Sequence, residues 1–213
     1  MLGSMKIHKS VLATLTFVAA LVLSLALSTR PAEAASPAEQ FVADSAQKAM
    51  SILNNAALSK EQRKTQFQGF LLGLTDIQAI GRYTIGQYRR SASPEDLTAF
   101  DAAFKDYALS VYQSYFAKYS GQMLKVTGST ELSADDTMVK TVTVDPKKPQ
   151  AKPYEVNFRV QTVGGRQVVS DFSVEGVWIR ELERNDFTSY LGQKGGDLKA
   201  LNAMLKQKAT QQR

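Results

Sequence analysis

The sequence contains no cysteine, and its one histidine, His8, lies close to the N-terminus. Without thiols, the chain has neither disulfide bonds nor a cysteine nucleophile. Beyond His8 there is no imidazole, which excludes a Ser-His-Asp triad, a zinc site of Cys and His ligands, and haem ligation by either residue. We therefore expect no metal or cofactor, and a fold that is held together by packing alone.

Long hydrophobic runs are absent from the sequence after residue 34. Val11–Leu27 is free of charge and mostly apolar, two lysines precede it, and the small-residue pattern Ala32-Glu33-Ala34 follows it. This order is typical of a secretory signal peptide. The alternative is an N-terminal membrane anchor, although the run is short for a bilayer span. We predict a signal peptide over 1–34, cleaved near Ala34, and one domain over 35–213.

Positive charge is present only in small excess. The formal net charge is +6 for the whole chain, and removing Lys6, Lys9, Arg30 and Glu33 with the signal peptide lowers it to +4. This excess suits an anionic partner such as a lipid headgroup. It is far below the Lys and Arg density of a nucleic-acid-binding protein, so we expect no nucleic-acid partner.

Helical patterns occupy the first part of the predicted domain. Ser36 and Ser59 read as N-caps of two helices, and Asp76 as the cap of a third. Ser93-Pro94-Glu95-Asp96 begins a long helix that runs to about Ser120. Near the C-terminus, Asn185 or Asp186 is expected to begin a short helix and Asp197 a last one.

The hydrophobic period changes to two after residue 122. Strands are predicted at 123–127, 138–144, 154–160 and 168–174, with 177–179 continuing the last one and Gly164-Gly165 as a tight hairpin turn. Strands in series between helices favour the α+β class. We predict an antiparallel twisted sheet of four to five strands, covered on one face by helices, with an apolar pocket between sheet and helices.

The long helix carries an aromatic stripe, and this stripe has two interpretations. Such a stripe usually forms ordinary core. However, it is rich in tyrosine, whose buried hydroxyls need partners, and a sheet with one apolar face beside a long apolar helix can enclose a ligand pocket. We expect the stripe to face the apolar side of strand 154–160. The candidate lipid-binding residues are Tyr107, Val111, Tyr115, Tyr154, Val156, Phe158, Phe172 and Trp178.

Without a thiol or an imidazole in the predicted domain, carboxylate chemistry is the enzymatic alternative. Asp171 and Glu175 flank one predicted strand, and Asp135-Asp136 lie in a loop. Catalysis by paired carboxylates needs a defined separation and a shifted pKa, and the sequence displays neither. We predict that the protein is not an enzyme. A carboxylate-dependent periplasmic hydrolase and a ligand-free transporter adaptor remain the alternatives.

Three stretches in order resemble the MlaC/toluene-tolerance family of periplasmic lipid carriers. They are Leu71–Tyr88, then Ser91–Leu97 with the aromatic residues that follow, and Val169–Val177 followed by Arg184 and Phe187. The chain departs from the family pattern at Arg89-Arg90, where Trp-Arg is frequent, at Asp96, where Gln is usual, and at Trp178, where a small Ser is common. Some members of the family are associated with hopanoids, and the chain resembles that subgroup about equally well.

The resemblance implies a periplasmic, monomeric shuttle without covalent chemistry. Its ligand would be a phospholipid or a hopanoid-like lipid, buried between sheet and helices with the headgroup at the mouth of the pocket. Its partners would be an outer-membrane lipoprotein and an inner-membrane ABC transporter with an MCE-domain subunit. Burial of apolar surface, at about 25 cal/mol per Å², supplies affinity for such a lipid without catalysis or metal.

Overall fold

The structure, a computed structural model, describes residues 35–117 and 121–211, although the side chains of 112–117 are not described. The predicted signal peptide lies outside the described residues. The elements are α2 (Pro37–Leu53), α3 (Lys60–Leu74), α4 (Ile77–Thr84), η1 (Gly86–Arg90), α5 (Pro94–Ala117), β1 (Met123–Ser133), β2 (Asp136–Val144), β3 (Glu155–Val163), β4 (Arg166–Val174), β5 (Val177–Trp178), α6 (Ile179–Gln193) and α7 (Leu198–Gln211).

Side-chain caps begin the first three helices where the sequence predicts them. Ser36 and Ser59 each form a capping box, with Glu39 and Gln62 respectively. The Asp76 carboxylate accepts a hydrogen bond from the amide of Ala79 at the start of α4. These local bonds satisfy amide groups that have no partner inside the helix, which is why short polar motifs define these starts.

The five strands form one antiparallel sheet in the order β1-β2-β3-β4-β5. Gly164 and Gly165 make the β3–β4 turn with φ values of 58° and 77°, a backbone region that favours glycine. β1 extends beyond its predicted end at residue 127, because Ser133 still pairs with Asp136. The predicted α+β fold with an antiparallel sheet is confirmed.

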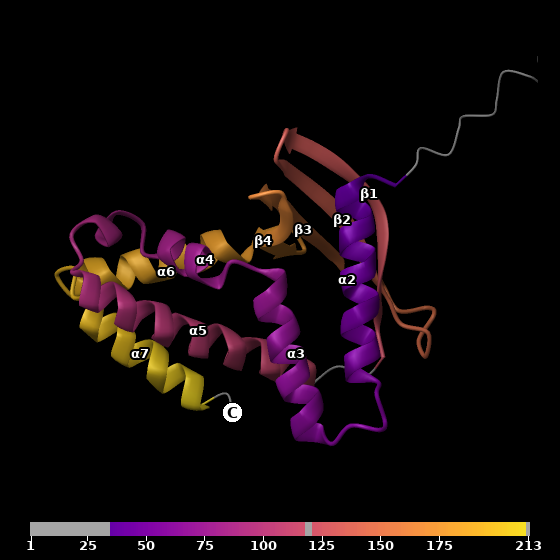
Figure 1. Ribbon diagram of the computed structural model, residues 1–213, viewed down its shortest axis with the longest axis horizontal. Coiled ribbons are helices and arrows are strands. Elements are labelled where there is room, and N and C mark those ends of the chain that lie inside the picture. The colour runs from indigo at the N-terminus through magenta and orange to yellow at the C-terminus, as the bar shows by residue number, and fades with distance from the viewer. Residues whose placement is uncertain (1–34, 118–120, 212–213) are drawn as a thin grey trace, which may run out of the picture. The chain divides into compact units, whose positions relative to one another are not determined.

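One face of the sheet is covered by α2, which runs beside β1 in Figure 1. Ala38 and Val42 of α2 are buried against Val139 and Val160, and Phe158 packs against the same cluster. The expectation that the apolar side of β3 faces the stripe of α5 is therefore wrong. The periodicity of α2 marks an apolar face, but it does not specify which strand that face covers.

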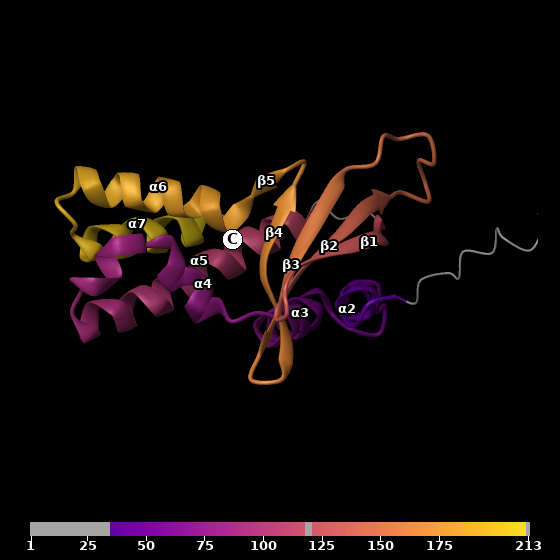
Figure 2. The same ribbon diagram turned by 90° about the horizontal axis from the view of Figure 1, so that it is seen from above.

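The second core is helical and lies beyond β4. α4 to α7 gather at this side of the sheet, whereas α2 and α3 lie along its face (Figure 2). α5 packs along α7 and against α4, with Phe100, Leu201 and Leu205 fully buried between them. Phe104 of α5 meets Phe187 of α6 edge to face, with ring centroids 6.3 Å apart. The long helix is thus covered mainly by other helices.

The start of α6 differs from the prediction. The expected strand 177–179 ends at Trp178, the helix begins at Ile179, and no cap at Asn185 or Asp186 is needed. Trp178 provides no side-chain cap. Instead the Asp171 carboxylate of β4 accepts a hydrogen bond from the amide of Arg180 at 3.0 Å. A cap that comes from a neighbouring strand leaves no local signature in the sequence.

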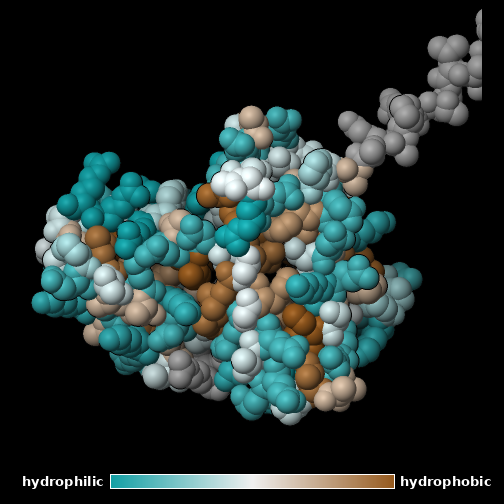
Figure 3. All heavy atoms as spheres, in the orientation of Figure 1, coloured by the Kyte–Doolittle hydropathy of each residue, from teal (hydrophilic) through white to brown (hydrophobic). Residues whose placement is uncertain are grey.

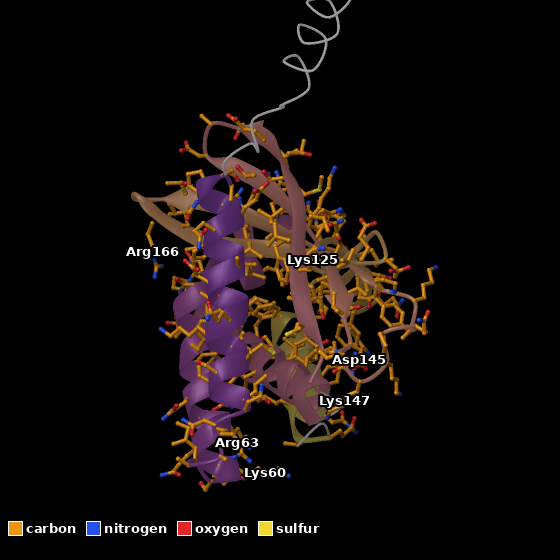
Figure 4. All side chains as sticks on the ribbon, turned by 90° about the vertical axis from the view of Figure 1, so that its right-hand side faces the viewer. Lys60, Arg63, Lys125, Asp145, Lys147 and Arg166 are labelled. Atoms are coloured by element: carbon orange, nitrogen blue, oxygen red, sulfur yellow. The ribbon has the colours of Figure 1, made fainter. Side chains whose placement is uncertain are left out.

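Polar contacts lie at the β3–β4 turn and in the loop after β2. Figure 4 shows Arg166 at the tip of the β3–β4 hairpin, where its guanidinium donates to the carbonyl oxygen of Gly73 in α3 at 3.4 Å. In the loop after β2, the Asp145 carboxylate accepts a hydrogen bond from the amide of Lys147 at 2.9 Å.

In the described part of the chain, no helix is long and apolar enough to cross a membrane.

Candidate functional site

A cavity of about 280 Å³ lies between β4 and helices α4, α5 and α6. It is close to the lower limit of the roughly 300–1,000 Å³ that small-molecule pockets occupy. Figure 3 shows apolar side chains gathered in a hollow near the middle of the face, where the chain passes from α3 to α4. The apolar part of the wall consists of Ile77, Ile80, Phe104, Ala108, Val111, Val169, Phe172, Ile179 and Leu182.

Helical spacing explains why α4 and α5 contribute these side chains. Ile77, Ile80 and Thr84 recur on one face of α4, and Phe104, Tyr107 and Val111 recur on one face of α5. The first two turns of α6 add Ile179 and Leu182. Three helices thus turn apolar faces toward the same space.

A β-bulge explains the contribution of β4. Val160 pairs with Val169 and Arg159 with Asp171, so Ser170 is an extra residue in β4. Because paired residues point to the same side of a sheet, the bulge lets Val169 and Phe172 share one face although they are three positions apart. Both line the cavity.

Asp171 is a buried carboxylate in the wall of the cavity, and groups of the protein lie next to both of its oxygens. Its Oδ1 accepts hydrogen bonds from the amides of Phe172 at 2.8 Å and Arg180 at 3.0 Å, and its Oδ2 lies 3.8 Å from Nε of Arg180. Burial raises the pKa of Asp171 above its ordinary value, although these amides and the charge of Arg180 act in the opposite direction. Asp171 thereby ties the start of α6 to the sheet.

Glu183 is the second carboxylate in the wall. Its Oε1 accepts a hydrogen bond from the hydroxyl of Tyr107 at 2.9 Å. This bond gives one tyrosine of the aromatic stripe the partner that its hydroxyl needs. Burial raises the pKa of Glu183, and the Tyr107 hydrogen bond lowers it by less. The cavity therefore combines apolar walls with a polar group held at a fixed position.

A cationic cluster lies beside the start of α6. The guanidinium groups of Arg180 and Arg184 lie 4.2 and 4.6 Å from the ring centre of Tyr83, and Arg180 also lines the cavity. The Tyr83 hydroxyl donates to Glu181 at 2.6 Å, and this hydrogen bond raises the pKa of Tyr83. Two guanidinium groups on an aromatic face are a suitable neighbour for an anionic headgroup.

The structure brings three of the eight candidate residues together in the cavity wall. Tyr107 and Val111 come from α5, and Phe172 comes from β4. Tyr115 is on α5, but its side chain lies outside the described residues. The register places Phe172 directly opposite Phe158, so these two side chains point to the same face of the sheet.

The other four candidates do not line this cavity. Tyr154 precedes β3 and is 61% exposed. Phe158 packs against the α2 cluster, and Val156 lies opposite Thr141 and Val174 in the sheet. Trp178 is on β5, opposite Ser173. The bulky ring at position 178 is thus absent from the wall of the cavity.

Sequence reasoning missed the contribution of α4 and the polar group of α6. The apolar repeat at Ile77 and Ile80 was visible, but nothing local indicated that it faces β4. Glu183 could not be distinguished from the exposed acids around it, because its burial depends on the packing of α5 against α6.

Three of the four carboxylates of the hydrolase alternative, Asp171, Glu175 and Asp136, have structural partners. Asp171 holds the start of α6, and the Glu175 carboxylate accepts a hydrogen bond from the amide of Glu155 at 2.7 Å. Asp136 is bound by Arg159 and Gln161, which hold its pKa below the ordinary value against the effect of burial. Within the described ranges, no group of three His, Cys, Asp or Glu side chains is placed to hold a metal ion.

A family model described as "MlaC protein" matches residues 43–207. The chain belongs to the MlaC family. It is 26% identical over 155 residues to the toluene tolerance protein Ttg2D of Pseudomonas putida, an alignment that covers 69% of this chain and 71% of that protein. The match to the family model, over residues 43–207, spans every element that lines the cavity.

The fold is also that of a solved structure. A phospholipid-binding protein from Ralstonia solanacearum, determined in complex with a phospholipid, superposes with a TM-score of 0.71. The superposition covers 83% of this MlaC family member and 99% of that protein, at 18% sequence identity. This likeness confirms the antiparallel α+β architecture of the chain.

Proposed function

We propose that this MlaC family member is a periplasmic lipid carrier that binds a phospholipid in the cavity between β4, α4, α5 and α6. The observation that carries the proposal is the cavity itself, which has apolar side chains from four elements and Arg180 in its wall. Membership of the MlaC family supports it, as does the likeness to a protein solved in complex with a phospholipid.

The acyl part of the lipid occupies the space beside Val111, Phe172 and Leu182, and Tyr107 contributes its ring to the same wall. Each methylene that leaves water for this wall contributes about 0.8 kcal/mol, so a single chain already supplies considerable affinity. The phosphate lies on the side of Arg180 and Arg184, whose charges attract it. Binding of this kind needs no catalytic group, and the protein is not an enzyme in this proposal.

A hopanoid-like lipid is the second candidate ligand. Phe104, Val111 and Phe172 present rings and branched chains to the cavity, and these pack against a rigid polycyclic skeleton as well as against acyl chains. Mass spectrometry of the bound lipid distinguishes the two candidate ligands.

The carrier works between two membranes in this proposal. A signal peptide over 1–34 directs its export to the periplasm. There the carrier, which is a monomer, exchanges lipid with an outer-membrane lipoprotein and with an MCE-domain ABC transporter of the inner membrane. Burial of the apolar tails inside the protein is what allows the lipid to cross an aqueous compartment.

Solvent extraction of the purified protein tests the proposal. Chloroform–methanol extracts of protein expressed with its leader are analysed by mass spectrometry, and the lipid recovered is compared with the amount of protein. We expect phospholipid, or a hopanoid-like lipid, close to one molecule per chain. An extract without lipid, from protein that also takes up none from phospholipid vesicles, would contradict the carrier function.

A further inference from the structure

Glu183 projects from α6 into the wall of a cavity that is otherwise largely apolar. Leu182 precedes it in the same wall, and Phe104 and Val111 of α5 line the same space. A carboxylate in such surroundings loses its hydration, and proteins keep buried carboxylates only where a partner compensates. The partners of Glu183 therefore indicate what this residue is for.

Only one of its two oxygens has a partner within the part of the chain that the structure describes. Tyr107 donates its hydroxyl to Oε1 at 2.9 Å, whereas Oε2 is buried and accepts no hydrogen bond from any described residue. Lys208 of α7 favours the charge of Glu183, but among the described residues it forms no ion pair with Glu183, and the nearby carboxylate of Asp186 opposes that charge.

Two comparisons within the molecule set Glu183 apart. Asp171, the other carboxylate of the cavity wall, has two amide donors on Oδ1 and the guanidinium of Arg180 at 3.8 Å from Oδ2, so a group of the protein faces each of its oxygens. Three further buried side-chain oxygens of the described chain lack a donor, those of Asn157, Ser173 and Asn202, and none of these residues lines the cavity. Among the described residues, only Glu183 combines a charge, an acceptor without a donor and a position in the wall of the cavity.

We propose that Oε2 of Glu183 accepts a hydrogen bond from a hydroxyl or ammonium group of the bound lipid, so that the cavity selects lipids that carry such a donor. Tyr107 holds the carboxylate through Oε1 and thereby fixes the direction of Oε2. This inference rests on the proposed lipid-carrier function and adds a specificity-determining residue to it. The donor has two sources, a substituent of the apolar part of the lipid or a group of the headgroup.

Two pairs of probe lipids separate these sources. The first pair is distearoyl phosphatidylcholine with and without a hydroxyl on one acyl chain, and the second is dipalmitoyl phosphatidylethanolamine against dipalmitoyl phosphatidylcholine. Dissociation constants are measured with the purified full chain after removal of endogenous lipid. We expect the donor-bearing lipid of at least one pair to bind about tenfold more tightly, because a hydrogen bond to a charged group is strong.

Variants assign this preference to Glu183. Glu183→Leu should abolish it, and Glu183→Gln, which keeps a neutral acceptor, should keep part of it. Leu182→Ala is the matched control in the same wall, and it should weaken both lipids of a pair equally. The inference would be overturned if the original protein bound the two lipids of each pair with equal affinity, or if Glu183→Leu kept the preference. Either result would leave the carrier function intact. Failure to bind any probe would instead contradict the carrier function.

Discussion

Asp171 is buried and Glu183 half-buried in the cavity wall, and the contacts of Asp171 give it a structural role that stability measurements can test directly. Asp171→Ala removes the acceptor for two amides and leaves the start of α6 uncapped. We expect a loss of about 1–3 kcal/mol in the free energy of unfolding, measured by urea denaturation. Asp171→Asn is the matched control, since its side-chain oxygen can still accept these bonds, and its loss should be smaller. Equal stability of the alanine variant and the original protein would show that the cap is unimportant.

Glu183 makes the stability of the protein depend on pH. Burial raises its pKa in the folded state above the ordinary value of 4.5, so the folded protein binds this proton more tightly than the unfolded chain does. The contribution of Glu183 to stability is therefore full below 4.5 and is lost as the pH rises through the raised pKa.

Glu183→Gln tests this dependence because glutamine does not ionise. We expect the variant to gain thermal stability relative to the original protein as the pH rises from about 4.5 to about 8. Melting temperatures of both proteins across this range give the comparison, and Asp171 titrates in both, so its effect cancels. A difference in melting temperature that stays constant with pH would contradict the raised pKa.

The packing of α4 against α5 depends on the absence of a side chain at Gly81. A Cβ at this position would lie 2.6 Å from Cδ1 of Phe104, whose ring is buried against Phe187 and cannot easily move away. We expect Gly81→Ala to cost about 1–3 kcal/mol in the free energy of unfolding, as overpacking does. Chemical denaturation measures the loss.

Gly73→Ala in α3 is the control for Gly81→Ala. A Cβ at Gly73 meets nothing within 4 Å, so alanine should raise the stability by up to about 1 kcal/mol through helix propensity alone. If both variants changed the stability in the same direction and by the same amount, the close approach of α4 and α5 would not be the cause.

Elements with local signals were predictable from the sequence, and those that depend on distant contacts were not. The caps at Ser36, Ser59 and Asp76 lie within three residues of the amides that they bind. The start of α6 was misplaced because its cap comes from Asp171, nine residues earlier on β4. Similarly, the apolar side of β3 was assigned to the wrong helix, since periodicity identifies a face but not its neighbour.

The same limit applies to the candidate site of the whole molecule. Tyr107 and Val111 could be predicted from the helical spacing of the stripe, and Phe172 from the alternation within the predicted strand 168–174, because each depends on the regular spacing of one element. The bulge at Ser170 arises from the pairing of β4 with β3, and the walls from α4 and α6 arise only when these helices meet α5 and β4. A cavity is a property of that assembly, so the sequence predicts parts of its wall more readily than its position.

Val111→Trp tests the central claim most directly, because Val111 faces the cavity and the claim is that a lipid occupies it. The paired measurement is co-purified lipid per protein and the free energy of unfolding, with Val139→Trp in the fully buried α2 cluster as the control. We predict that Val111→Trp loses most of its lipid and changes the stability by less than about 1 kcal/mol, whereas Val139→Trp loses about 1–3 kcal/mol or more. A Val111→Trp protein that is as destabilised as the control and still retains its lipid would contradict the account.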